Sequence, residues 1–142
     1  MKNKIIYVVI LLLLVLLLMI GYLGKDTKKF HGRKNTYQLL GYKQFNQLKE
    51  DQDIILVDVR SFLEYSTGHI EGAINIPLNS ITESDDLTKL FPDKKAIYVF
   101  YCHSGNRSKT ASELLLRAGY ENIFDLGGIQ DYPGPIVKDS TK

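Results

Sequence analysis

Beyond its N-terminal quarter, the chain alternates short apolar runs with amphipathic stretches. Residues 54–57 and 96–101 are continuous apolar runs rich in Ile, Val and aromatic residues, as expected of strands buried on both faces of a sheet. Between such runs the apolar residues follow helical spacing, for example at Tyr42, Phe45 and Leu48. This alternation predicts an α/β fold with a parallel sheet and helices on both of its faces.

Three further strands and one long helix are predicted from shorter signals. The strands are expected at residues 37–40, 73–76 and 123–126. Residues 108–118 place their apolar positions on one helical face, and Gly119 is a natural C-terminal stop for that helix. About a hundred residues in this arrangement can bury a self-sufficient core.

Two S-x-x-E sequences mark expected helix starts, because a Ser N-cap and a Glu three positions later form a reciprocal capping box. The first begins at Ser61, directly after a predicted strand. The second begins at Ser80 and predicts a helix that reaches Phe91 and is ended by Pro92.

The N-terminal segment differs from the rest of the chain. Residues 5–24 carry no charge, and residues 5–20 are an unbroken run of Ile, Leu, Val, Met and Tyr. About 20 residues at roughly 1.5 Å rise per residue can cross a hydrocarbon core about 30 Å thick. We therefore predict a single-pass transmembrane segment over residues 1–24. A cleaved secretory signal is the alternative, but the run ends without an A-x-A-like pair of small residues, which favours an uncleaved anchor.

The charges around this segment bear on its orientation. Lys2 and Lys4 precede it, whereas five basic residues lie within residues 25–34. The excess on the C-terminal side favours a domain on the cytoplasmic side of the membrane, although an N-terminus of this kind also commonly leads to export. Residues 25–36 are interpreted as a basic juxtamembrane linker, which either lies near anionic lipid headgroups of the bilayer or is an ordinary solvated segment.

Composition narrows the choice of partners and cofactors. Residues 35–142 carry eleven basic and fifteen acidic residues, so no basic surface for nucleic acid is expected. The single cysteine, Cys102, excludes an intramolecular disulfide, and no Cys/His spacing indicates a structural metal site. No metal or other cofactor is expected.

The richest chemistry surrounds Cys102, which follows the apolar run at residues 96–101. In α/β sheets, binding sites form where a strand gives way to a helix. The backbone N–H groups of a short loop, a helix N-terminus and a guanidinium together suit an anionic ligand. The candidate binding residues are His103, Ser104, Gly105, Asn106 and Arg107. In such surroundings the thiol is expected to ionise and to act as a nucleophile, whereas a lone cysteine is otherwise often a buried packing residue.

Three sequence blocks resemble those of single-domain rhodaneses, which are sulfurtransferases. They are ILVDVR at residues 55–60, GHIEGAINIP at residues 68–77 and YCHSGNRS at residues 101–108. The resemblance extends over residues 37–137 and leaves residues 138–142 as a tail. It implies a five-stranded parallel sheet flanked by helices. It also implies that Cys102 takes sulfane sulfur from thiosulfate or a similar small anion as a persulfide, and passes it to a thiophile such as cyanide or a cellular thiol.

The resemblance further implies supporting roles for Asp58 and Arg60, which are expected to brace the site. A pair of Arg60 with Glu64 or Glu71 is plausible as structure alone. Arg107 either orients the anionic donor or pairs with a surface carboxylate.

Two histidines are assigned no chemical step. His103 is expected to face solvent and to shape substrate access, because a thiol that is already ionised needs no general base. His69 is expected to make a structural hydrogen bond in its turn.

Two other functions compete with the enzyme. Phosphatases and arsenate reductases with a related cysteine loop have five residues between Cys and Arg, whereas four separate Cys102 from Arg107. The shorter loop argues against a phosphatase. A membrane-tethered sulfur carrier or redox sensor, which loads Cys102 without efficient turnover, stays open because a soluble sulfurtransferase needs no anchor.

Overall fold

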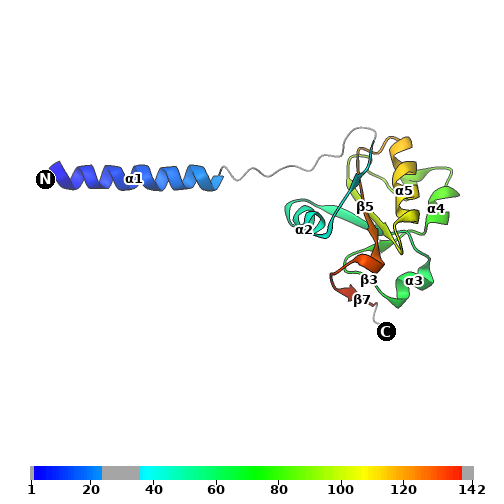
Figure 1. Cartoon of the computed structure of the whole chain (residues 1–142). Helices are drawn as coiled ribbons and strands as arrows, with labels where there is room; N and C mark the ends of the chain where they lie inside the picture. The colour runs from blue at the N-terminus through cyan, green and yellow to red at the C-terminus, as the bar shows by residue number, and fades with distance from the viewer. Residues whose placement is uncertain (1, 24–35, 139–142) are drawn as a thin grey trace.

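The computed structural model describes residues 2–23 and 36–138, and within the second range the chain forms an α/β domain around a parallel sheet (Figure 1). All strands of this sheet pair in parallel, in the order β1-β6-β5-β2-β4. The strands are β1 (Gln38–Leu39), β2 (Ile54–Asp58), β4 (Ile74–Asn75), β5 (Ile97–Cys102) and β6 (Asn122–Gly128). The predicted α/β class and the five-stranded parallel sheet are confirmed.

Helices cover both faces of the sheet, as the alternating pattern predicts. Helix α2 (Tyr42–Asp51) lies on one face, and α4 (Leu78–Thr82) and α5 (Asn106–Arg117) lie on the other (Figure 1). Within α2, the spacing of Phe45 and Leu48 places both side chains in the core. The helix expected after the cysteine loop is α5, and Gly119 ends it with a φ of 87°.

Alternating residues of β5 build the two halves of the core. Phe100 and Cys102 face α5, whereas Val99 and Tyr101 face α2. This follows from the period of two along a strand, which sends neighbouring side chains to opposite faces. All four residues are buried, so Cys102 lies at the buried end of the strand.

The helix expected to start at Ser80 and run to Phe91 is wrong. Helix α4 begins directly after Pro77, so Ser80 lies inside it, and the helix ends at Thr82. A separate 3₁₀ turn, η1 (Leu87–Lys89), follows, because the side chain of Asp86 accepts the Thr88 N–H and starts a new helical turn there. The apolar residues of the expected helix still reach the core through this turn, with Phe91 fully buried.

Three further elements were not predicted. Strand β3 (His69–Ile70) pairs antiparallel with β7 (Ile136–Val137) in a small second sheet, and η2 (Ile129–Asp131) is a 3₁₀ turn after β6. Helix α3 (Phe62–Thr67), in contrast, begins at the predicted Ser61 capping box. The sequence around β3 and β7 was not recognised as a strand pattern, and the two strands have only two residues each.

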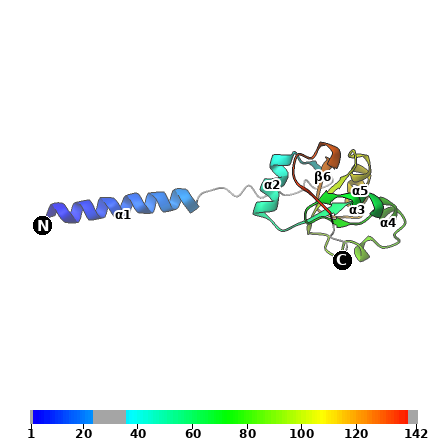
Figure 2. The same ribbon diagram turned by 90° about the horizontal axis from the view of Figure 1, so that it is seen from below.

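Helix α1 (Lys2–Leu23) has 22 residues and lies apart from the domain in both views (Figures 1 and 2). Among the residues that the structure describes, no helix has the length and apolar character required to cross a membrane. The transmembrane segment predicted for residues 1–24 is therefore not shown here and stays a prediction. The basic linker at residues 25–36 and the tail at 138–142 lie outside the described residues, apart from residues 36 and 138.

Candidate active site

Cys102 is the last residue of β5, and only three residues separate it from the first residue of α5. The neighbouring strand β2 ends beside it, with Asp58 paired to Tyr101. The thiol therefore lies at the carboxyl edge of the sheet and at the N-terminus of a twelve-residue helix. Both positions favour an anionic ligand or a negatively charged sulfur.

The loop turns back on the sulfur through Gly105. The Gly105 N–H donates to the Cys102 Sγ at 3.1 Å. Gly105 has a φ of 93°, a left-handed conformation that favours glycine and that turns its N–H toward the sulfur. Its carbonyl oxygen accepts from Lys109 N and from the hydroxyl of Ser108, which ties the loop to the first turn of α5. One N–H of the predicted anion cradle is thus aimed at the sulfur.

Two glycines at the end of β6 pack against the back of this loop. A Cβ at Gly128 would lie 2.6 Å from the His103 carbonyl oxygen and 2.9 Å from the Ser104 Cα. Gly127 has a φ of 84°, again in the left-handed region. Any side chain at Gly128 would displace the loop, so this pair fixes the position of the loop from behind.

Arg107, in the first turn of α5, makes a bidentate ion pair with Glu64 of α3. Its two terminal nitrogens donate to the two carboxylate oxygens at 2.8 and 2.7 Å. The Ser61 N–H and hydroxyl donate to the same carboxylate, as in the predicted capping box. Arg107 and Ser61 hold the pKa of Glu64 far below its usual range. Glu64 raises the pKa of Arg107, and the nearby Cys102 does so to a smaller degree.

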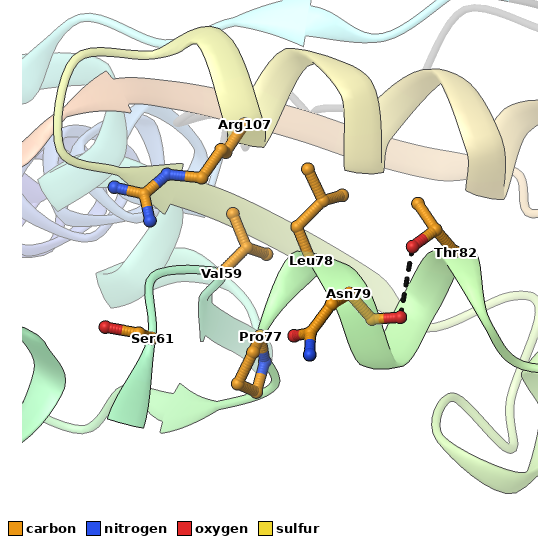
Figure 3. Close-up of a pocket in the computed structure, with 7 residues that line it drawn as sticks. All are labelled: Val59, Ser61, Pro77, Leu78, Asn79, Thr82 and Arg107. Carbon is orange, nitrogen blue, oxygen red and sulfur yellow. Dashed lines mark hydrogen bonds between the residues drawn. The ribbon is translucent and has the colours of Figure 1, made fainter. Parts of the chain in front are cut away.

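A cavity of about 360 Å³ opens beside this arginine (Figure 3). Val59, Pro77 and Leu78 form an apolar wall, and Ser61, Asn79, Thr82 and Arg107 supply polar groups. The hydroxyl of Thr82 already donates to the Asn79 carbonyl oxygen at 3.0 Å, as the dashed line in Figure 3 shows. Cys102 does not line this cavity, although it belongs to the same core cluster as Val59, which does.

A second cavity, of about 390 Å³, lies on the other side of the loop. Ser104 reaches it from the loop, and Tyr42 and Tyr132 line it in an edge-to-face contact with ring centroids 5.4 Å apart. Of the two cavities, only the first is lined by Arg107, and only the second is lined by a loop residue, Ser104.

Asp58 and Arg60 form a buried pair beneath the loop. The Arg60 guanidinium donates to both carboxylate oxygens of Asp58, at 2.6 to 3.0 Å, and to the Gly68 carbonyl oxygen at 2.7 Å. It also lies 5.8 Å from the centroid of the Tyr101 ring. Burial opposes the charge of Arg60, but the hydrogen bonds and charge of Asp58 outweigh it and raise the pKa. The pairing of Arg60 with Glu64 or Glu71 suggested above is wrong, because Asp58 occupies its guanidinium and Glu64 pairs with Arg107.

The remaining predicted residues lie as follows. His103 and Ser104 are exposed on the loop, Asn106 is exposed at the start of α5, and His103 faces solvent as expected. His69 is buried, hydrogen-bonds the Tyr65 carbonyl oxygen at 3.1 Å and stacks on the Tyr65 ring, in keeping with a structural role. No group of three His, Cys, Asp or Glu side chains within residues 2–23 and 36–138 is placed to hold a metal ion.

The sequence left open a pair of Arg107 with a surface carboxylate, and the structure contains such a pair, but Glu64 was not named as the partner. The sequence places Glu64 at the third position of a helix that starts from the carboxyl end of β2. Because the carboxyl ends of parallel strands share one edge, that helix start and the cysteine loop are neighbours. The capping box was therefore the signal that could have placed a carboxylate near Arg107.

This combination of a five-stranded parallel sheet, a cysteine at a strand end and a tight loop into a helix defines a rhodanese-like domain. The model of the family described as Rhodanese-like domain matches residues 42–133, and the chain belongs to this family.

Two curated relatives share 37% identity with the chain. One is the tRNA uridine(34) hydroxylase of Yersinia enterocolitica, over 101 residues that cover 69% of this chain and 29% of the relative. The other is that of Yersinia pestis (strain Pestoides F), over 92 residues that cover 63% and 26%. The chain thus spans less than a third of the length of these relatives, and the match concerns a part of each.

Solved structures share the fold. A rhodanese with anions from E. coli is 36% identical, with a TM-score of 0.54 and coverage of 61% of this chain and 99% of that one. A rhodanese-like domain protein from Staphylococcus aureus is 26% identical, with a TM-score of 0.61 and coverage of 72% and 99%. A thiosulfate sulfurtransferase from Pseudomonas aeruginosa, at 22% identity and a TM-score of 0.62, covers 75% of this chain and 21% of that one, and shows the fold alone.

Proposed function

We propose that this protein is a sulfurtransferase in which Cys102 takes sulfane sulfur from thiosulfate or a similar donor and passes it to a thiophilic acceptor. The proposal rests above all on the contact between the Gly105 N–H and the Cys102 Sγ at 3.1 Å, at the start of α5. A donor group aimed at this position stabilises negative charge on the thiolate and on the sulfur attached to it. The membership of the rhodanese-like family supports the same chemistry.

The reaction proceeds by two sulfur transfers. The Cys102 thiolate attacks the outer sulfur of thiosulfate, a new S–S bond forms at Sγ, and the bond to the sulfonate sulfur breaks with its electron pair leaving on sulfite. The persulfide carries its negative charge on the terminal sulfur. An acceptor thiolate or cyanide then attacks that sulfur, and the Cys102 thiolate is restored.

Mass spectrometry tests the first transfer. Full-length protein treated with millimolar thiosulfate should gain the mass of one sulfur atom on the peptide that contains Cys102, and a reductant should remove it. Cys102→Ser is the matched control and should gain none. A folded wild-type protein that forms no such adduct would exclude the proposed function.

A second candidate function is a membrane-tethered sulfur carrier or redox sensor. It is motivated by the apolar segment at residues 5–24 and the basic residues after it, which a soluble sulfurtransferase does not need. The two functions differ in turnover. If Cys102 loads once but cyanide and small thiols remove the sulfur no faster than they exchange with a free persulfide, the carrier is the correct function.

Attachment to a lipid bilayer is a separate proposal that rests on the sequence of residues 5–24, with the domain placed on the cytoplasmic side by the basic residues that follow. It predicts that the chain stays in the membrane fraction after an alkaline wash and that a chain lacking residues 2–23 is released. A C-terminal tag that external protease removes from intact cells would place the domain on the other side.

A further inference from the structure

The positive charge of Arg107 is already neutralised by an ion pair within the protein. Both terminal nitrogens of Arg107 are engaged by Glu64, at 2.8 and 2.7 Å. Each side chain of the pair is 36% exposed, so solvent reaches the carboxylate as well as the guanidinium. An anion that approaches Arg107 therefore meets a pair of zero net charge.

Glu64 is also held in this position from its own helix. Its Oε2 accepts from the Ser61 N–H at 3.0 Å and from the Ser61 hydroxyl at 2.8 Å, in addition to Arg107. Turning Glu64 away to free the guanidinium would break the N-terminal cap of α3 as well as the ion pair. Hydrogen bonds from both Arg107 and Ser61 therefore hold the Glu64 carboxylate in the pair.

The wall next to this pair is apolar. Val59, Pro77 and Leu78 line the cavity beside the Arg107 guanidinium (Figure 3). Apolar side chains donate no hydrogen bonds to the oxygens of an inorganic anion. They do favour the binding of a carbon substituent, because its transfer from water to an apolar surface is favourable. The zero net charge of the Glu64–Arg107 pair and the apolar wall therefore both favour a donor with a low charge and a carbon substituent.

We propose that Glu64 tunes the site for sulfur donors with a single negative charge and a carbon substituent, such as organic thiosulfonates and persulfides, in preference to dianionic thiosulfate. This inference rests on the proposed sulfurtransferase function. Sulfur transfer from a thiosulfonate proceeds as it does from thiosulfate. The Cys102 Sγ forms a bond to the outer sulfur, and the bond between that sulfur and the sulfonyl sulfur breaks, with its electron pair leaving on a sulfinate. Glu64 acts through charge and through Arg107, and it is a specificity residue.

Two donors of nearly equal shape isolate the effect of charge. Methanethiosulfonate differs from thiosulfate by a methyl group in place of one oxygen, and it carries one negative charge instead of two. Glu64→Gln removes the charge of residue 64, while a glutamine at this position still completes a capping box. The matched control is Glu121→Gln, which neutralises an exposed carboxylate next to the first residue of β6, at the opposite edge of the sheet.

We expect Glu64→Gln to raise kcat/KM about three- to tenfold for thiosulfate and about two- to threefold for methanethiosulfonate, because the repulsion removed scales with the charge of the donor. The gain should shrink as salt is added, and Glu121→Gln should leave the ratio between the donors unchanged. An unchanged ratio in Glu64→Gln, or a fall with both donors, would show that Glu64 only orients Arg107 and would overturn the inference. In either case a persulfide on wild-type Cys102 would leave the proposed function standing, whereas absence of persulfide with both donors would exclude both.

Discussion

The two ion pairs beside the cysteine loop are built from the same chemical groups and differ in burial. In the Asp58–Arg60 pair the side chains are 0% and 6% exposed, and the guanidinium has a further acceptor in the Gly68 carbonyl. In the Glu64–Arg107 pair each side chain is 36% exposed. Breaking a buried pair leaves an uncompensated charge in the interior, whereas solvent replaces the partner in an exposed pair. We infer that the Asp58–Arg60 pair stabilises the fold around the site, whereas the Glu64–Arg107 pair affects which sulfur donor binds.

The largest expected effect comes from Asp58→Asn, which leaves the Arg60 cation buried without a counter-charge. We expect it to lower the free energy of unfolding by about 3–5 kcal/mol, to be measured by urea denaturation. The double variant Asp58→Asn/Arg60→Met removes the charge as well and should recover part of the loss. A loss below about 1 kcal/mol in the single variant would show that the buried pair stabilises the fold no more than the exposed pair does.

Arg107→Ala should separate activity from stability. The free energy of unfolding is expected to change by less than about 1 kcal/mol, because the pair is exposed. The value of kcat/KM for thiosulfate should fall roughly ten- to hundredfold, since a contact to an anion worth about 1.5–3 kcal/mol is lost and Glu64 is left uncompensated.

The double variant Arg107→Ala/Glu64→Gln sharpens this prediction, because it removes both charges and should regain part of the rate. An unchanged rate with thiosulfate in the single variant would assign Arg107 to structure alone.

Arg60→Lys keeps the charge of the buried pair and removes its planar fork. An ammonium on a flexible stem cannot match the contacts to both oxygens of Asp58 and to the Gly68 carbonyl together, so one buried acceptor loses its donor. We expect a cost of about 1–2 kcal/mol in thermal or urea unfolding, smaller than that of Asp58→Asn. Equal costs would mean that geometry matters as much as charge in this pair.

The smallest effect is on the pH dependence of stability. The pKa of Glu64 is lowered in the folded protein, so its contribution is fully present above its unfolded pKa of about 4.3 and is lost as the pH falls toward the folded value. Because the pair is exposed, we expect a contribution below about 1 kcal/mol. The difference in unfolding free energy between pH 7 and pH 3 should be smaller in Glu64→Gln than in wild type, and equal differences would contradict the pairing.

The hydrophobic periodicity of the sequence predicted most of the fold, and one helix was wrong because a local hydrogen bond prevailed over that periodicity. The strand that ends at Cys102 and the helix that follows it are long enough to show their patterns, and both were predicted within one or two residues. The helix expected at Ser80 was predicted from its apolar spacing. It is not continuous, because Asp86 accepts a hydrogen bond from the Thr88 N–H and so stabilises a separate turn. Local hydrogen bonding prevailed over apolar spacing there.

In the site, the sequence identified the individual residues more reliably than their partners. The capping box between Ser61 and Glu64 spans three residues and was predicted from its pattern alone. The contact of Glu64 with Arg107 spans 43 residues, and it exists because α3 and α5 both start from the same edge of the sheet. The spacing of residues alone does not predict this contact, which follows only when the capping box is combined with the shared carboxyl edge of β2 and β5. The same holds for Gly128, whose closeness to the loop depends on the position of β6.

The burial of Cys102 has a practical consequence for chemical probes. It is the only thiol in the chain, and at 1% exposure it lies behind its own loop, with the Gly105 N–H on its sulfur. A reagent must be narrow enough to pass the loop, so iodoacetamide should alkylate the folded protein faster than a bulky maleimide dye. In denaturant this steric barrier disappears. The ratio of dye labelling with and without denaturant therefore reports how often the loop opens.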